Sequence, residues 1–241
     1  MQILLAGFIL LVAAGCGAQD TTQRPADVSI DGAYTLTTAS PGGIGKWYMG
    51  REISHVMGHL GAGWLERPER EQVERTDLLV DNLPLQADSI VADIGAGTGY
   101  FSFPVASRVP AGLVLAVDIQ HEMYDIISTR ALALGVENVK PILGTIKGTG
   151  IDSESVDLIF IVDAYHEFSH PLEMGRAMVN ALKPDGQLVL IEYRGEDPSV
   201  PIKRLHKMTE VQAKAEMAAI GLRWVRTENF LPQQHFMVFE K

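Results

Sequence analysis

The sequence is poor in cysteine and in basic residues. Cys16 is the one cysteine among 241 residues, which excludes internal disulfides and any cysteine-rich metal site. Lys and Arg number 20 against 30 Asp and Glu, so the formal net charge is −10. An acidic surface repels phosphate backbones, and we therefore expect no nucleic-acid partner. The composition, 46% hydrophobic and 21% charged, is that of a globular protein.

The sequence also lacks a long hydrophobic run near its start. The apolar run from Ile3 to Ala14 is shorter than the roughly 20 residues of a transmembrane helix, but it suits the core of a signal peptide. The following Ala13-Ala14-Gly15-Cys16 resembles a bacterial lipobox. We predict a signal peptide over residues 1–15, a lipidated Cys16 and a polar tether over 16–45. The alternative is an ordinary buried N-terminal strand or helix.

Strand-like and helix-like segments alternate from about residue 70 onward. Two of the strand-like segments, 156–162 and 188–191, are apolar nearly throughout, which is typical of parallel strands covered on both faces. The alternation predicts an α/β fold with an open, doubly wound sheet. Expected strands are 89–94, 113–118, 138–143, 156–162, 187–193, 222–227 and 235–240, and expected helices are 68–82, 100–109, 121–134, 171–182 and 209–220. No helix separates the last two strands, which predicts an antiparallel hairpin.

A glycine-rich loop follows the first of these strands, in Asp93-Ile94-Gly95-Ala96-Gly97-Thr98-Gly99-Tyr100. Glycine lets the backbone turn sharply and approach a ligand closely. Tyr100 stands where the dinucleotide fingerprint requires its third glycine, which disfavours a nicotinamide oxidoreductase. Asp118 ends the second strand, where an acidic group can accept hydrogen bonds from ribose hydroxyls.

Residues 91–101 resemble motif I of the class I S-adenosylmethionine-dependent methyltransferases (type 11-like). Further matches follow in order at 117–119, 160–168 and 182–188, and the resemblance covers roughly residues 70–241. It implies a Rossmann-like, seven-stranded sheet of order 3-2-1-4-5-7-6 with the last strand antiparallel. It also implies S-adenosylmethionine as cofactor, bound through Asp93, Gly95, Ala96, Gly97, Thr98, Gly99, Asp118, Ile119, Thr145 and Asp163.

The loop after the fourth strand contains Tyr165, His166 and Glu167 and is similar to an aromatic–His–His segment of this family. These three are the candidate catalytic residues. A base is needed only if the acceptor must lose a proton, in which case His166 suits by its pKa and Glu167 would orient it. The alternative is that both side chains only hold the loop.

Residues 46–69 are rich in aromatic residues, Gly, Met and His, and we predict that they form a lid over the acceptor site. The candidate acceptor-binding residues are Tyr48, Arg51, His55, His59 and Trp64. His55 and His59 would share a helix face, which permits metal binding, but no third ligand has the required spacing; packing is favoured and no metal site is predicted.

The sequence therefore predicts an enzyme that transfers a methyl group from S-adenosylmethionine to a small acceptor. A basic cluster at residues 201–207 would attract an anionic acceptor or be a solvated loop. The expected location is the cell envelope, lipid-anchored to the membrane and facing the periplasm; the alternative is cytoplasmic. An exported protein would lie apart from a cofactor made in the cytosol, so a membrane-tethered binding module without turnover is the second hypothesis.

Overall fold

The computed structural model describes residues 28–30 and 32–241. The predicted signal peptide and Cys16 lie outside the described residues. Within the described part, no helix combines the length and the apolar character needed to cross a membrane.

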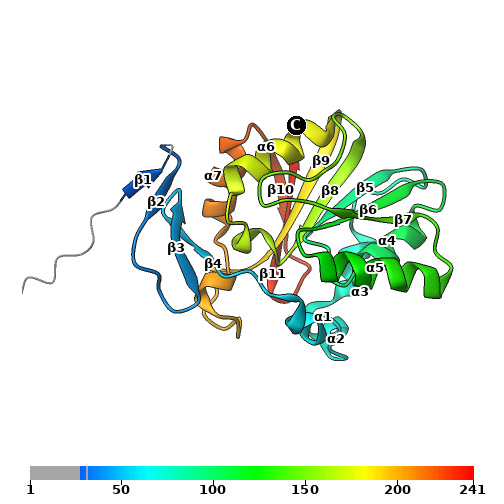
Figure 1. Ribbon diagram of the computed structural model, residues 1–241, viewed down its shortest axis with the longest axis horizontal. Coiled ribbons are helices and arrows are strands. Elements are labelled where there is room, and N and C mark those ends of the chain that lie inside the picture. The colour runs from blue at the N-terminus through cyan, green and yellow to red at the C-terminus, as the bar shows by residue number, and fades with distance from the viewer. Residues whose placement is uncertain (1–27, 31) are drawn as a thin grey trace, which may run out of the picture.

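A seven-stranded sheet forms the centre of the molecule (Figure 1). Its order is β10-β11-β9-β8-β5-β6-β7, and β11 is antiparallel to both of its neighbours. Numbered within the sheet, this order is 3-2-1-4-5-7-6 with the last strand antiparallel, so the predicted topology is confirmed. The strands are β5 (Ile90–Ile94), β6 (Leu113–Asp118), β7 (Val139–Leu143), β8 (Val156–Val162), β9 (Leu182–Tyr193), β10 (Arg223–Glu228) and β11 (Gln234–Glu240).

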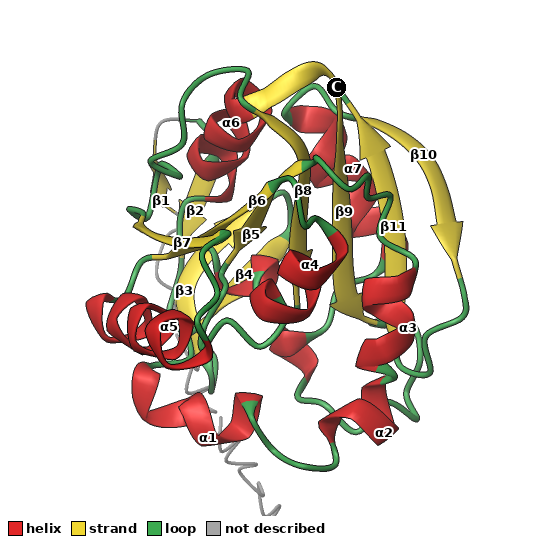
Figure 2. Cartoon of the chain, turned by 90° about the vertical axis from the view of Figure 1, so that its right-hand side faces the viewer, coloured by secondary structure: helices red, strands yellow, loops and turns green. Residues whose placement is uncertain are grey.

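Helices cover both faces of this sheet (Figure 2). α3 (Thr76–Asp81), α4 (Ser102–Arg108) and α5 (His121–Leu134) pack on one face, while α6 (Pro171–Ala181) and α7 (Glu210–Ala219) pack on the other. In β8, Leu158 and Phe160 contribute to the first core and Ile159 and Ile161 to the second. The continuous apolar run of this strand is therefore explained by burial on both sides.

A second, four-stranded antiparallel sheet precedes the central one, and here the structure differs from the predicted tether. It consists of β1 (Val28–Ile30), β2 (Tyr34–Leu36), β3 (Gly43–Tyr48) and β4 (Arg51–Ser54). Its polar sequence folds around the buried carboxylate of Glu52, which accepts hydrogen bonds from the backbone N–H groups of Ser40 and Gly45. Its strands are short and bury few large side chains, which is why the segment reads as a tether in sequence.

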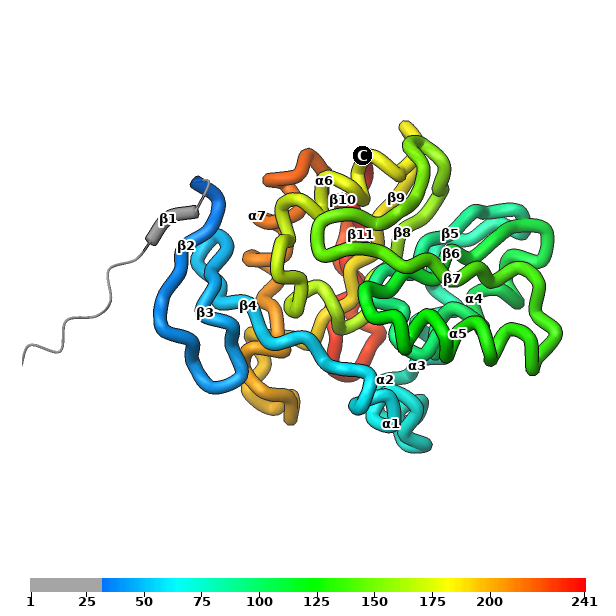
Figure 3. Tube along the Cα trace, in the orientation of Figure 1, coloured from blue at the N-terminus to red at the C-terminus, as the bar shows by residue number. Residues whose placement is uncertain are grey.

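The chain between the two sheets runs along one edge of the central sheet (Figure 3). It contains the 3-10 turn η1 (His59–Gly61), α1 (Ala62–Leu65) and α2 (Arg70–Glu74). The helix expected over 68–82 is divided into α2 and α3 at Arg75, whose φ of +56° is incompatible with a right-handed helix. Two further 3-10 turns, η2 (Tyr165–Glu167) and η3 (Arg204–His206), follow β8 and β9.

Candidate active site

A cavity of about 230 Å³ opens at the carboxyl edge of the central sheet. Its walls come from the ends of β5, β6 and β8 and from the segment that follows β4. In doubly wound sheets this edge is where ligands bind. The lining residues include Gly95, Gly97, Asp118, Ile119, Gln120, Ile146, Asp163, Ala164, Glu167, His55, Met57 and Leu65.

The glycine loop after β5 approaches this cavity with its backbone. Gly95 and Gly97 have φ angles of +79° and +56°, which L-residues with a side chain rarely adopt. A Cβ on Gly95 would lie 2.7 Å from the Cβ of Ala164, and a Cβ on Gly97 would lie 2.6 Å from Leu65 Cδ1. The two glycines therefore keep free the space that side chains would occupy.

Asp118 holds the loops after β5 and β6 together. Its Oδ2 accepts a hydrogen bond from the Gly97 N–H at 2.9 Å, and its Oδ1 accepts one from the Gln120 N–H at 2.9 Å. Burial raises the pKa of this carboxyl group, although the backbone N–H groups act in the opposite direction. Each oxygen retains a lone pair with which it can accept a hydrogen bond from a ligand.

Asp163 lies at the end of β8 in the wall of the same cavity. Its Oδ2 accepts a hydrogen bond of 3.3 Å from Gln234 Nε2, whereas its buried Oδ1 has no hydrogen-bond partner in the described part of the chain. Burial, assisted by the nearby carboxylate of Glu74, raises the pKa of Asp163 well above its usual range. An unpartnered buried carboxylate oxygen beside a cavity is a place where a ligand's donor group would be stabilised.

Asp93 lies beneath the glycine loop and does not line the cavity. Its side chain is buried, and its Oδ2 accepts a 2.6 Å hydrogen bond from Ser102 Oγ. Burial raises the pKa of Asp93 to about 7. The structure thus gives Asp93 a contact with the start of α4.

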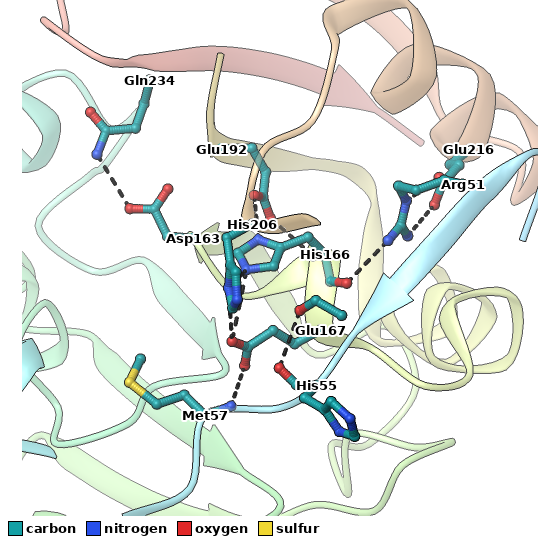
Figure 4. A network of polar contacts seen from close by, with 11 residues as sticks. Arg51, His55, Met57, Asp163, His166, Glu167, Glu192, His206, Glu216 and Gln234 are labelled. Carbon is teal, nitrogen blue, oxygen red and sulfur yellow. Dashed lines mark hydrogen bonds and ion pairs between the residues drawn. The ribbon is translucent and has the colours of Figure 1, made fainter. Parts of the chain in front are cut away.

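A network of polar side chains surrounds η2 (Figure 4). His166 is buried, and its Nδ1 lies 2.7 Å from Glu192 Oε2, while its Nε2 lies 3.1 Å from His206 Nδ1. Glu167 lines the cavity, and its Oε2 accepts a 3.0 Å hydrogen bond from the Met57 N–H. Glu192 therefore orients His166. Of the neighbours His166 and Glu167, it is Glu167 that lines the cavity.

Burial shifts the ionisation of two members of this network toward the neutral form. It raises the pKa of the Glu167 carboxyl group. It also lowers the pKa of His206 to about 4, and the proximity of His166 contributes in the same direction.

The structure brings five of the ten predicted cofactor-binding residues to the cavity, namely Gly95, Gly97, Asp118, Ile119 and Asp163. Ala96, Thr98 and Gly99 belong to the same loop but do not line the cavity; the Thr98 hydroxyl donates to Glu66 Oε1 at 2.6 Å. Thr145 lies in an exposed turn closed by a bridge to Gly148, next to the lining residue Ile146. The cofactor-binding roles of all ten residues remain predictions.

Of the predicted acceptor-binding residues, only His55 lines the cavity. Tyr48 is buried against Tyr34, with ring centroids 5.4 Å apart, and Arg51 forms an ion pair with Glu216. His59 lies near Glu122, and the exposed Trp64 stacks under the guanidinium of Arg67. Among the predicted catalytic residues, Tyr165 and His166 are buried outside the lining and Glu167 is part of it.

Sequence reasoning missed three residues that organise the site: Gln120, Glu192 and His206. Gln120 joins the loop after β6 to the segment after β4, because its Nε2 donates to Met57 O at 3.0 Å and its Oε1 accepts from the His59 N–H at 2.8 Å. Its position two residues after Asp118 is the one signal that the sequence offered. Glu192 and His206 lie 26 and 40 residues after His166, so only the fold brings them together.

Comparisons with known proteins agree with this geometry. Residues 91–186 match the family described as a methyltransferase domain. An uncharacterized methyltransferase of Bacillus subtilis, YcgJ, is 33% identical over 135 residues, which are 55% of this chain and 53% of that protein. A tRNA U34 carboxymethyltransferase of Desulfotalea psychrophila is 28% identical over 131 residues, 54% of this chain and 39% of that protein. The chain thus spans about half the length, or less, of these curated relatives.

A solved structure shows the same fold. The S-adenosylmethionine-dependent methyltransferase of Aquifex aeolicus superposes with a TM-score of 0.71 at 21% identity, over 76% of this chain and 98% of that one. The fold is Rossmann-like and of the methyltransferase type. Together the matches show a resemblance to methyltransferases, in sequence over residues 91–186 and in fold over 76% of the chain.

Proposed function

We propose that this chain transfers the methyl group of S-adenosylmethionine to a small acceptor bound beside Glu167. The observation that carries the proposal is the cavity at the carboxyl edge of the sheet, whose wall combines two side-chain-free glycines with the carboxylates of Asp118 and Asp163.

The residues of the cavity suit this cofactor. Asp118 would accept hydrogen bonds from ribose hydroxyls, and Ile119, which also lines the cavity, would offer an apolar surface next to it. The unpartnered Oδ1 of Asp163 would accept a hydrogen bond from the cationic amino group of the cofactor. When bound, S-adenosylmethionine supplies an electrophilic methyl group on a positively charged sulfur.

The chain's contribution to the reaction is chiefly to position the acceptor. The acceptor forms a bond to the methyl carbon while the bond from that carbon to sulfur breaks, and the electron pair remains on sulfur. Holding the two groups in line contributes up to about 7–11 kcal/mol to the lowering of a barrier of this kind. If the acceptor releases a proton, Glu167 is a candidate to receive it, because it lines the cavity and burial raises its pKa.

Calorimetric titration of the full chain with S-adenosylmethionine and S-adenosylhomocysteine tests the proposal. We expect saturable binding of both, and we expect Asp118→Asn to weaken it about 10-fold or more, since a charge-assisted hydrogen bond contributes about 1.5–3 kcal/mol. Asp185→Asn is the matched control, because Asp185 is an exposed residue of β9 that does not line the cavity. A folded chain that binds neither compound would contradict the proposal, and binding without turnover on any acceptor would favour the binding module.

We also propose that Cys16 is lipidated and anchors the protein in the cell envelope. The sequence supports this through the apolar run before Cys16 and the absence of any other cysteine. A single acyl chain binds membranes only marginally, whereas several chains anchor a protein stably. Metabolic labelling with a lipid precursor should mark the wild-type chain and not Cys16→Ala; equal labelling of both would contradict the anchor.

A further inference from the structure

Three side chains from two separate turns converge beside the cavity. His166 Nε2 and His206 Nδ1 are 3.1 Å apart, and Glu167 Oε1 lies 3.8 Å from the first and 3.7 Å from the second. His166 and Glu167 belong to η2, and His206 belongs to η3. In the part of the chain that the structure describes, no other group of three or more His, Cys, Asp or Glu residues is arranged to hold a metal ion.

The three atoms have the spacing of metal ligands. A triangle with these sides has its centre about 2.1 Å from every corner, and bonds from Zn²⁺ to histidine nitrogen and carboxylate oxygen are about 2.0–2.2 Å long. An ion at or just above this centre would therefore reach all three atoms without a rearrangement of the backbone.

Hydrogen bonds hold two of the three ligand side chains in place. Glu192 is buried and its carboxylate can only accept, so the 2.7 Å contact places a proton of His166 on Nδ1 and leaves Nε2 with a lone pair on the side of His206. Glu167 is fixed by the Met57 N–H at its other oxygen, Oε2, which leaves Oε1 for the cluster. A carboxylate that orients a metal-binding histidine through its second nitrogen is a recurrent feature of metal sites.

We propose that His166, His206 and Glu167 bind one divalent transition-metal ion of the zinc type. Two imidazole nitrogens and one carboxylate oxygen suit zinc or another late first-row metal, whereas Mg²⁺ and Ca²⁺ prefer oxygen ligands only. Three protein ligands leave at least one coordination position open, as in catalytic zinc sites.

Glu167 connects the proposed metal site to the cavity, since the same side chain lines the cavity. The ion would lie in the cavity wall, where it could bind an oxygen or nitrogen atom of the acceptor and lower the pKa of that group, so that a deprotonated nucleophile would form near neutral pH. The metal site itself does not depend on the proposed methyl transfer, because it rests on the geometry of the three ligands alone.

Metal binding by the full chain tests the proposal without any activity measurement. The protein should carry no histidine tag and should have Cys16→Ser as its background, so that neither an added histidine nor the cysteine contributes a ligand. After treatment with a chelator, titration with Co²⁺ followed by visible absorption, and competition by Zn²⁺, should show one equivalent bound with the spectrum of a site containing nitrogen and oxygen ligands. Mg²⁺ in large excess should not displace it.

Ligand variants decide whether this cluster is the site. His206→Ala and Glu167→Gln should abolish stoichiometric binding, and Glu192→Gln should weaken it about 10–100-fold as an orienting partner does. His121→Ala is the matched control, because His121 is an exposed histidine on α5 that contacts only Asp125 and its own helix. Absence of Co²⁺ and Zn²⁺ binding by the folded parent chain, or equal binding by the parent and both ligand variants, would overturn the proposal.

Discussion

Several buried carboxyl groups gather at the carboxyl edge of the central sheet. Burial raises the pKa of three of them, Asp93, Asp118 and Asp163, above the value that the group has in water. A bound cation would reverse part of that shift, since it stabilises the ionised form. At the residue scale, the proposed cofactor and the acidic cavity therefore match in charge.

Asp93 should make the stability of the protein depend on pH. Its pKa is about 7 in the folded chain against 3.8 for the unperturbed group, so between these values the folded state binds a proton that the unfolded state has released. The free energy of unfolding should consequently fall as pH rises through this window and level off above it. The contribution is on the order of 4 kcal/mol at most.

Asp93→Asn isolates this contribution, because the amide oxygen can still accept the hydrogen bond from Ser102 and the residue cannot ionise. Urea unfolding of both proteins from about pH 4 to pH 8 should show the variant gaining stability relative to wild type as pH rises. Subtracting the free energies of unfolding of the two proteins at each pH removes the contribution of the other carboxyl groups, because these groups titrate in both proteins. A difference that does not change with pH would refute the assignment.

At the scale of elements, one buried ion pair fastens the N-terminal sheet to the central domain. Arg51 in β4 donates to both oxygens of Glu216 in α7, at 2.8 and 3.0 Å, and to the carbonyl oxygen of His166 at 3.0 Å. The side chain of Glu216 has no exposed surface. Because removal of one partner leaves a buried charge unpaired, Arg51→Ala should lower the free energy of unfolding by about 3–5 kcal/mol.

Two companion variants separate this ion pair from general effects of losing an arginine. Arg75→Ala breaks an exposed pair with Asp77 and should lower the free energy of unfolding far less than Arg51→Ala does. The double variant Arg51→Ala, Glu216→Ala should lose less free energy of unfolding than the two single variants lose in sum, since no unpaired charge remains. Strictly additive costs, measured by urea unfolding, would show that the two side chains do not act as a pair.

The elements differ in how far the sequence could predict them. The central sheet was predictable, because segments that are apolar nearly throughout, such as 156–162, are typical of buried strands, and the order of the motifs along the chain implied the topology. The four-stranded sheet was not, because its strands rest on Glu52, a charged residue whose burial depends on hydrogen bonds from Ser40 and Gly45. A charged residue in a polar segment gives no sign in sequence that it will be buried.

At the scale of the whole molecule, the site is assembled from parts that are far apart in the chain. The glycine loop, Asp118 and Asp163 could be predicted because each directly follows a strand, and strand ends meet at one edge of a parallel sheet. Glu192 lies inside β9 and carried no signal, while His206 belongs to the basic cluster 201–207, whose charge gave no sign of a contact with His166. Their contact with His166 arises from the tertiary fold alone.

The segment of residues 55–66 should become more protected when the cofactor binds, as expected for a lid. It is joined to cavity residues through hydrogen bonds from its own backbone, since the Met57 N–H donates to Glu167 and the His59 N–H donates to Gln120. A ligand held by Asp118 and the glycine loop would order these partners and so slow the opening of the segment. Hydrogen–deuterium exchange of the full chain should therefore show slower exchange over residues 55–66 after addition of S-adenosylhomocysteine.

Residues 128–134, at the end of α5, serve as the internal control because they lie outside the cavity lining and their exchange should not change. Gln120→Ala should reduce the protection of the segment, because it removes both hydrogen bonds of that side chain to residues 57 and 59. Cofactor binding with unaltered exchange over 55–66 would mean that the segment is a fixed wall of the cavity. Slower exchange in wild type but not in Gln120→Ala would identify Gln120 as the link that couples the segment to the loop of Asp118.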